Sequence, residues 1–212
     1  MVLVDRKQRE FERREEDILD AALLLFSQPN WESVSIEKVA KQAQIGKGTV
    51  YKHFESKDEL LFRLMLRFYQ GMLQALPFEK LAEMPLVDGF RHILPLAFNY
   101  HLENREYRYI VEYTNRIDFK SRAKKEWRDA FKVLDEAFGE KSDPAILAAM
   151  DQGLIERRSL NELHIGMHAC FEGTINMLWA GNDWFAKGNS EQIIEGAINF
   201  MISGLIGNLN NQ

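Results

Sequence analysis

Basic and hydrogen-bonding side chains gather in one short segment of this 212-residue chain, between residues 41 and 57. The segment holds four lysines and one glutamate, a formal charge of +3, whereas the whole chain carries −5 at pH 7. Ammonium and hydroxyl groups suit the phosphate oxygens and base edges of DNA. Because neutralised phosphates release counterions, a local basic patch in an acidic chain indicates nucleic-acid binding. The alternative is the solvated face of a helical bundle.

The elements around this patch predict a helix-turn-helix. Ser35 can cap a first helix, residues 44–46 interrupt its apolar pattern, and a second short helix follows over 47–54. In such a motif the second helix enters the major groove and the first lies across the DNA backbone. The four residues from Ser56 to Glu59 form a capping box that starts the next helix.

A further helix is predicted upstream, where apolar residues recur from Ile18 to Phe26 and Pro29 ends the pattern. Residues 5–16 before it balance basic and acidic side chains, so we expect a frayed, solvated terminus there. The alternative is a basic arm at Arg6 to Arg9 that reaches DNA.

The helix-turn-helix segment resembles the TetR family of bacterial transcriptional repressors, over roughly residues 12 to 70. The matching residues are Ile36, Val39, Ala40, Ala43, Ile45, Lys47 to Tyr51, His53, Phe54 and Ser56 to Leu60. Two positions depart from the family pattern: Gln44 stands where glycine is usual, and Gly46 stands where serine is usual. A non-glycine residue at positive φ carries strain of about 1 kcal/mol or more.

The resemblance implies DNA-contacting roles for individual residues of this chain. Phosphate contacts are implied for Ser35, Tyr51, His53 and Lys57. Groove-facing positions are implied for Lys47, Gly48, Thr49 and Lys52. The same resemblance implies a homodimer on a palindromic operator, repression, and release by a small hydrophobic or amphipathic ligand bound in each subunit.

Beyond the motif the chain is predicted to be all-α, with no strand-like alternation. We expect a three-helix DNA-binding head over residues 1–56 and a larger helical ligand-binding and dimerisation bundle over 57–212, as in the TetR family. Helices are predicted near 86–102, 105–116, 119–138, 144–156, 160–186 and 191–209. The single cysteine, Cys170, excludes a disulfide within the chain, and no segment is long and apolar enough to span a bilayer, so we expect a soluble, cytoplasmic protein.

The last two predicted helices are candidates for the dimer interface, because one short helix-turn-helix gains site recognition by pairing across a two-fold axis. The apolar residues assigned to this interface are Leu163, Met167, Ile194, Ile198, Met201, Leu205 and Leu209. The alternative is that this broad apolar stripe is simply core.

The middle helices offer a candidate ligand pocket, because pockets are mostly apolar with a few polar groups. Its predicted lining is Phe90, Leu94, Phe98, Tyr109, Tyr113, Trp127, Phe131, Phe171 and Trp179. Each of these aromatic or aliphatic residues has plain core packing as its alternative role. No cofactor is predicted.

A different class of function has weaker support. His164, His168 and Glu172 are spaced four residues apart, which puts them on one helical face as a possible set of metal ligands. The sequence contains no nucleophile elbow, glycine-rich phosphate loop or convincing carboxylate pair, so we expect no enzyme. Three hypotheses remain, and the sequence favours the first: a ligand-responsive repressor, a DNA-binding protein without a small-molecule input, and a helical metal-binding enzyme.

Overall fold

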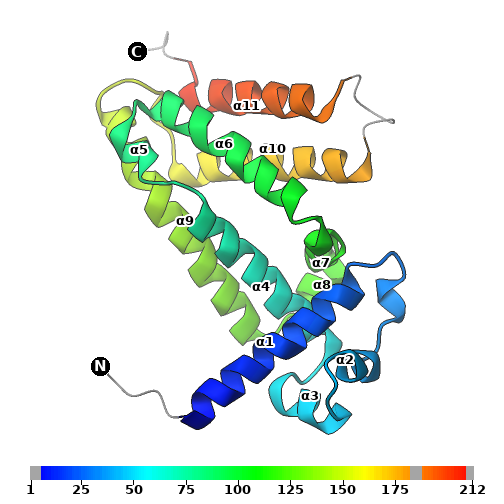
Figure 1. Ribbon diagram of the computed structural model, residues 1–212. Helices are drawn as coiled ribbons and strands as arrows, with labels where there is room; N and C mark the ends of the chain where they lie inside the picture. The colour runs from blue at the N-terminus through cyan, green and yellow to red at the C-terminus, as the bar shows by residue number, and fades with distance from the viewer. Residues whose placement is uncertain (1–5, 182–187, 209–212) are drawn as a thin grey trace. The chain divides into compact units, whose positions relative to one another are not determined.

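The computed structural model describes residues 6–181 and 188–208, and within these ranges the regular structure is entirely helical (Figure 1). The all-α prediction is therefore confirmed. None of the helices in the described part of the chain is both long and apolar enough to cross a membrane.

The chain divides into two compact units, which are described separately. Unit 1 comprises the residues up to Gly71 together with Asn104–Phe131. It contains α1 (Arg6–Phe26), η1 (Trp31–Ser33), α2 (Ile36–Gln42), α3 (Lys47–His53), most of α4 (Lys57–Ala75), η2 (Arg105–Tyr107), α7 (Arg108–Thr114), α8 (Ile117–Arg122) and the first turns of α9 (Lys125–Asp151). Unit 2 contains the remainder of α4 and α9 with α5 (Lys80–Glu83), α6 (Leu86–Glu103), α10 (Leu160–Ala180) and α11 (Ser190–Ile206).

Unit 1 is built around the apolar face of α1, whose Ile18, Ala22 and Phe26 are fully buried. α2 packs on α1, and α3 packs on α2. Arg67 of α4 ties this head to η2: its guanidinium donates to the Tyr107 hydroxyl at 3.0 Å and pairs with acidic side chains of α1. The compact unit that holds the helix-turn-helix thus includes residues 104–131 as well, and the predicted boundary after residue 56 lies inside it.

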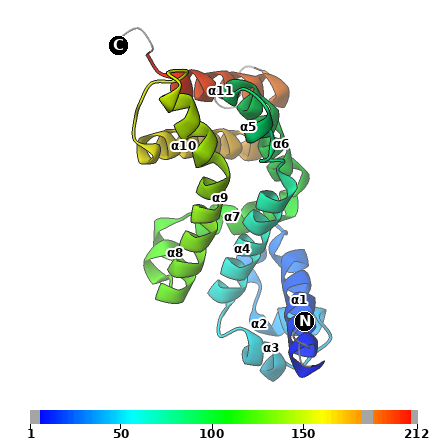
Figure 2. The ribbon, with the colours of Figure 1, turned by 90° about the vertical axis from the view of Figure 1, so that its left-hand side faces the viewer.

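In unit 2, α10 lies along α11, and α6 packs against both helices (Figure 2). Phe98 of α6 stacks on Phe171 of α10 with ring centroids 4.5 Å apart. His101 is fully buried beside Phe171 and Trp179, and its Nδ1–H donates to the Ala97 carbonyl at 3.1 Å. Burial lowers the pKa of His101 to about 4, so the imidazole is neutral at pH 7.

Several predicted helix ends are confirmed by their caps. Ser35 accepts a hydrogen bond from the Lys38 amide at 3.3 Å, and Ser159 accepts one from the Glu162 amide at 3.1 Å. In the predicted capping box, Ser56 accepts from the Glu59 amide at 3.1 Å, while the Glu59 carboxylate accepts from the Glu55 amide at 2.6 Å.

The helix predicted near 119–138 is divided at residues 123–124 between α8 and α9. Two further sequence predictions about helices are wrong. The first is the break before Pro144, which instead lies inside the continuous helix α9. The carboxylate of Asp143 does not start a helix there but pairs with His164 of α10, a contact that the local pattern could not show. The second concerns the expected frayed terminus, because α1 already begins at Arg6, with ion pairs such as Arg6–Glu10 along it.

The C-terminal end of α11 is fastened by the loop between α9 and α10. The Glu156 amide donates to the Ile206 carbonyl at 2.9 Å, and the Glu156 carboxylate accepts from the Asn208 amide at 3.0 Å. Arg158 donates to the Leu205 carbonyl at 3.0 Å. Gly207 turns the chain with φ +70°, and a Cβ at this position would lie 2.8 Å from the Cβ of Glu156.

We predict that Gly207→Ala lowers the free energy of unfolding by about 3 kcal/mol, because it combines a left-handed backbone with a collision against Glu156. Gly153→Ala is the matched control, since Gly153 has φ +69° and open space where the added methyl group would stand, so only the backbone term of about 1 kcal/mol applies. Urea denaturation of both variants measures the difference. Equal losses would contradict the role given to Glu156.

Candidate nucleic-acid interface

The turn between α2 and α3 is closed by backbone hydrogen bonds and one strained residue. Gln44 adopts φ +55°, as its place at the family's glycine position suggested. The Ile45 amide donates to the Ala40 carbonyl at 2.9 Å, which brings the chain back over the end of α2. Gly46 then caps α3 with its backbone alone, because the Thr49 amide donates to the Gly46 carbonyl at 2.8 Å.

α3 presents one face to solvent and one to the protein. Val50 is fully buried, whereas Lys47, Gly48, Tyr51 and Lys52 are exposed. Thr49 is half-buried. Because a Cβ on Gly48 would meet nothing within 4 Å, packing inside the protein does not require a glycine here. The exposed face is therefore a basic surface that an external backbone can approach closely.

Ser35 lies at the other end of the motif, as the capping residue at the start of α2. Its oxygen accepts the Lys38 amide, and its hydroxyl hydrogen remains able to donate to a phosphate. The predicted role of Ser35 is thus compatible with its capping bond.

His53 points inward, in contrast to the predicted phosphate contact. Its side chain is only 6% exposed, its ring centroid lies 4.1 Å from that of Phe11, and Nδ1 lies 3.8 Å from the Glu15 carboxylate. His53 therefore packs the end of α3 against α1. This packing orients the exposed residues of α3.

Lys57 is likewise engaged inside unit 1. Its ammonium donates to the carbonyls of Trp31 at 3.1 Å and Glu32 at 2.7 Å, and it lies over the rings of Phe26 and Trp31. Desolvation by burial lowers the pKa of Lys57. The ammonium for which a phosphate contact is predicted thus fastens α4 to the segment before α2.

Residues far along the chain complete this region, and sequence reasoning missed them. Arg122 pairs with Asp58 at 3.3 Å and donates to the Tyr113 hydroxyl at 2.8 Å, while Lys124 pairs with Glu55. The two ion pairs each join residues more than sixty positions apart. No local sequence pattern signals such contacts.

The predicted pocket residues are divided between the two units. Phe90, Leu94, Phe98, Phe171 and Trp179 belong to unit 2, where all but the half-buried Phe171 are buried. The other four residues belong to unit 1, and these are Tyr109, Tyr113, Trp127 and Phe131.

Within unit 1 the aromatic residues of this set have protein partners. Tyr113 packs edge-on against Trp31 at 4.9 Å, and Trp127 stacks on Phe62 at 5.2 Å. Phe131 is partly exposed and lies 6.5 Å from the ring of Tyr69. These contacts give Tyr113, Trp127 and Phe131 a packing role.

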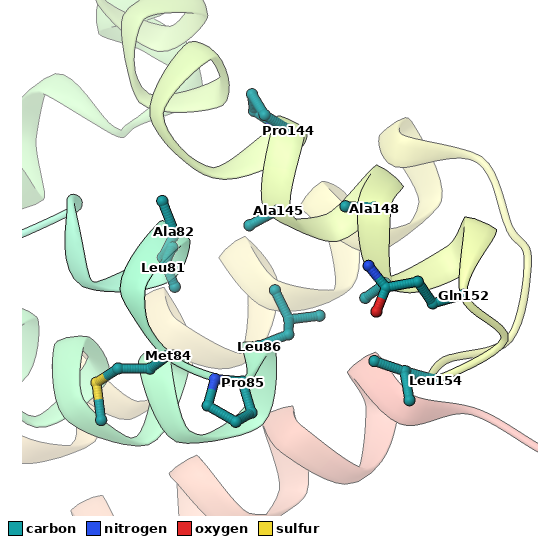
Figure 3. Close-up of a pocket in the computed structure, with 11 residues that line it drawn as sticks. Leu81, Ala82, Met84, Pro85, Leu86, Pro144, Ala145, Ala148, Gln152 and Leu154 are labelled. Carbon is teal, nitrogen blue, oxygen red and sulfur yellow. The ribbon is translucent and has the colours of Figure 1, made fainter.

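Unit 2 contains a hollow of about 330 Å³ between α5, the start of α6 and the second half of α9 (Figure 3). Its lining is apolar apart from the amide of Gln152. The lining residues are Leu81, Ala82, Met84, Pro85, Leu86, Pro144, Ala145, Ala148, Ala149, Gln152 and Leu154. None of the nine predicted pocket residues is among them.

Most residues predicted for the dimer interface are turned into unit 2. Leu163, Ile198, Met201 and Leu205 are buried where α10 and α11 pack together. Met167 and Ile194 are half-buried, and Leu209 lies outside the described residues. The outward faces of these helices carry other apolar side chains, namely Ile165, Met177 and Phe200.

The candidate metal ligands do not form a metal site. Across residues 6–181 and 188–208, no three His, Cys, Asp or Glu side chains are grouped so that they could hold a metal ion. His164 pairs instead with Asp143 of α9, with Nε2 2.7 Å from Oδ1. Spacing put His164, His168 and Glu172 on one face, but tertiary packing gave His164 a different partner.

Comparison with known proteins agrees with the geometry of the motif. Residues 18–64 match the sequence model described as bacterial regulatory proteins of the tetR family. The uncharacterized HTH-type regulator YhgD of Bacillus subtilis is 31% identical over 103 residues, which is 44% of this chain and 54% of YhgD. YuxN of the same organism, also uncharacterized, is 38% identical over 56 residues, which is 26% of this chain and 19% of YuxN. The chain thus aligns with about a fifth to a half of the length of these two relatives.

Solved structures extend the likeness of the fold to nearly the whole chain. A TetR family regulator from Marinobacter aquaeolei has a TM-score of 0.64 at 20% identity, covering 93% of this chain and 97% of its own. The fatty acid degradation regulator FadR from Bacillus halodurans has a TM-score of 0.68 at 12% identity, covering 89% and 98%. AibR, solved with isovaleryl coenzyme A and operator DNA, has a TM-score of 0.61 at 19% identity, covering 91% and 98%.

The helix-turn-helix, its exposed basic face, the matched family sequence and the shared fold lead to one assignment. The chain belongs to the TetR family of bacterial transcriptional regulators.

Proposed function

We propose that this regulator is a homodimeric repressor that reads a palindromic operator with α3 and is released by a small hydrophobic or amphipathic ligand. The observation that carries the proposal is the outward face of α3, where Lys47, Gly48, Tyr51 and Lys52 stand free of the protein core. Ser35 and Thr49 border this face. Phosphate contacts by Tyr51 and Ser35 would fix the register, while Lys47, Thr49 and Lys52 would meet base edges.

A second copy of the chain is needed because seven residues of α3 offer few base contacts. The outward faces of α10 and α11 support pairing there. Phe200 is 71% exposed and Ile165 is 61% exposed. Gly166 and Gly173 have open space where a side chain would stand, which permits a close approach of helices from a partner. Burial of these apolar side chains would stabilise the dimer.

A ligand input is supported by the neighbours and by unit 2. AibR was solved with isovaleryl coenzyme A, and FadR is named for fatty acid degradation. The cluster of Phe98, Phe171, Trp179 and the neutral His101 offers apolar surroundings with few polar groups, as ligand sites do. Such a ligand would change the spacing of the two helix-turn-helix segments in the dimer. Because operator half-sites lie about 34 to 36 Å apart, a changed spacing would weaken binding to the operator.

We predict that Tyr51→Ala weakens binding to every duplex by about tenfold, since a lost phosphate contact removes roughly 1.4 kcal/mol without changing sequence preference. Lys52→Ala should change the preferred sequence recovered by in vitro selection. Lys141→Ala makes the same charge change outside unit 1 and should bind as the wild type does. Fluorescence anisotropy with a duplex that the wild-type protein selects in vitro measures the affinity of each variant. Unchanged affinity and preference in both α3 variants would sink the assignment of this face.

Lys57→Ala is expected to act differently, through stability. Removing the ammonium leaves the carbonyls of Trp31 and Glu32 without their donor, so the thermal midpoint of the free protein should fall. A weaker complex with an unchanged midpoint would point instead to direct phosphate contact.

Phe200→Glu is predicted to give monomers in analytical ultracentrifugation, because it puts a charge in the middle of the proposed dimer face. Leu147→Glu, an exposed apolar position on α9, is the matched control and should stay dimeric. Leu205→Glu is unsuitable for this test, since Leu205 is buried in unit 2 and its replacement would unfold the chain. A dimeric F200E protein would refute this location.

For the ligand, we expect isovaleryl coenzyme A or a longer acyl coenzyme A to raise the thermal midpoint and to release the selected duplex. A ligand at a hundred times its Kd stabilises the folded state by about 2.7 kcal/mol. Free coenzyme A and the matching carboxylates are the controls. If no acyl chain length shifts the midpoint, the acyl thioester class is excluded.

A further inference from the structure

Carboxylates crowd the corner that follows the recognition helix α3. Glu55, Asp58 and Glu59 lie within six residues of His53, where α3 ends. Glu59 is occupied as an acceptor for the Glu55 amide. The side chain of Glu55 is 74% exposed, so its charge faces solvent at the end of the proposed DNA-binding surface.

Glu55 is close enough to α3 for its charge to affect a phosphate bound there. Glu55 is three residues beyond Lys52, so their Cα atoms are at most about 11 Å apart. Screening in about 0.1 M salt acts over about 10 Å. Because Lys52 and Glu55 are about one screening length apart at most, salt weakens but does not abolish the repulsion between Glu55 and a phosphate bound at Lys52. The corner would weaken the attraction that the lysines of α3 provide.

Two cations from a distant part of unit 1 lie on this corner. Lys124, directly before α9, pairs with Glu55, and this hydrogen bond raises the pKa of Lys124. Arg122, at the end of α8, pairs with Asp58 at 3.3 Å. Tyr113 completes the group, because its hydroxyl lies 3.4 Å from Asp58 and accepts from Arg122 at 2.8 Å.

We propose that Arg122 and Lys124 are positioning residues for DNA binding, which neutralise Asp58 and Glu55 and thereby keep the end of α3 attractive to phosphate. The inference rests on the proposed DNA-binding role of α3. It adds a contribution from residues that lie outside the helix-turn-helix and that touch no DNA themselves.

A role in folding alone does not explain these pairs. The side chains of Lys124 and Arg122 are each 47% exposed, and ion pairs at such exposed positions contribute little to the free energy of unfolding. Their variants should consequently remain folded. An effect on DNA binding can then be separated from an effect on stability.

The test is a double-mutant cycle on Lys124 and Glu55, measured by anisotropy with a duplex selected in vitro by the wild-type protein. Lys124→Gln should weaken binding about 3- to 10-fold at about 0.1 M salt, and the loss should shrink at higher salt as the uncovered charge is screened. Glu55→Gln should bind at least as tightly as the wild type. The double variant K124Q/E55Q should return to within about twofold of the wild type, because neither charge is then unbalanced.

Lys125→Gln is the matched control. It removes the same charge one residue further along the chain, where Lys125 pairs with Asp129 of its own helix instead of the head. It should stay within about twofold of the wild type. Arg122→Gln should weaken binding in the same direction as K124Q, and Arg122→Lys should restore most of it. Circular dichroism melts should be unchanged for the Lys124 and Glu55 variants.

Three results would overturn the inference. The first is a K124Q protein that binds like the wild type, and the second is a K125Q protein that loses as much affinity as K124Q, because either outcome removes the special role of the Glu55 pair. The third is a double variant as weak as K124Q, which would show that Lys124 contacts DNA directly. If the wild-type protein selects no duplex at all, the proposed function itself fails, and this outcome is distinct from the other three.

Discussion

The orientation of the exposed face of α3 depends on the burial of Val50 and Phe54. α3 has seven residues, and an isolated helix shorter than about 12 residues is marginal in water. Both apolar side chains are fully buried, so the helix is held by tertiary packing and its opposite face is left to solvent. His53 adds a contact with α1 at the C-terminal end of α3. The packing of Val50, Phe54 and His53 therefore fixes the orientation of the exposed lysines of α3.

Tertiary packing also maintains the strained turn between α2 and α3. Gln44 holds a left-handed backbone conformation that glycine would adopt more readily, and the Ile45 amide keeps the turn closed by its bond to Ala40. Packing on both sides of the turn offsets a local cost of about 1 kcal/mol. Lys57 acts in the same direction, because it fastens α4 to the segment before α2 through two carbonyls.

Electrostatics adds a second level of organisation in unit 1. The chain is acidic as a whole, so carboxylates beside the basic residues of α3 matter to any phosphate ligand. Arg122 of α8 and Lys124 before α9 lie on the carboxylates beside α3. Unit 1 contains both the helix-turn-helix and these two residues. Their ion pairs are among the contacts that join residues 104–131 to the first 71 residues of the chain.

The sequence by itself determined the helical class, the helix-turn-helix, the caps at Ser35 and Ser159 and the bounds of α6, because these follow from local periodicity and from hydrogen bonds within a few residues. Tertiary structure alone decided the roles of His53, Lys57 and Asp143, whose partners are distant in sequence. It also decided which face of α10 and α11 is core. Since α10 is apolar around most of its circumference, periodicity could not tell buried Leu163 from exposed Ile165, and only packing against α6 and α11 separates them.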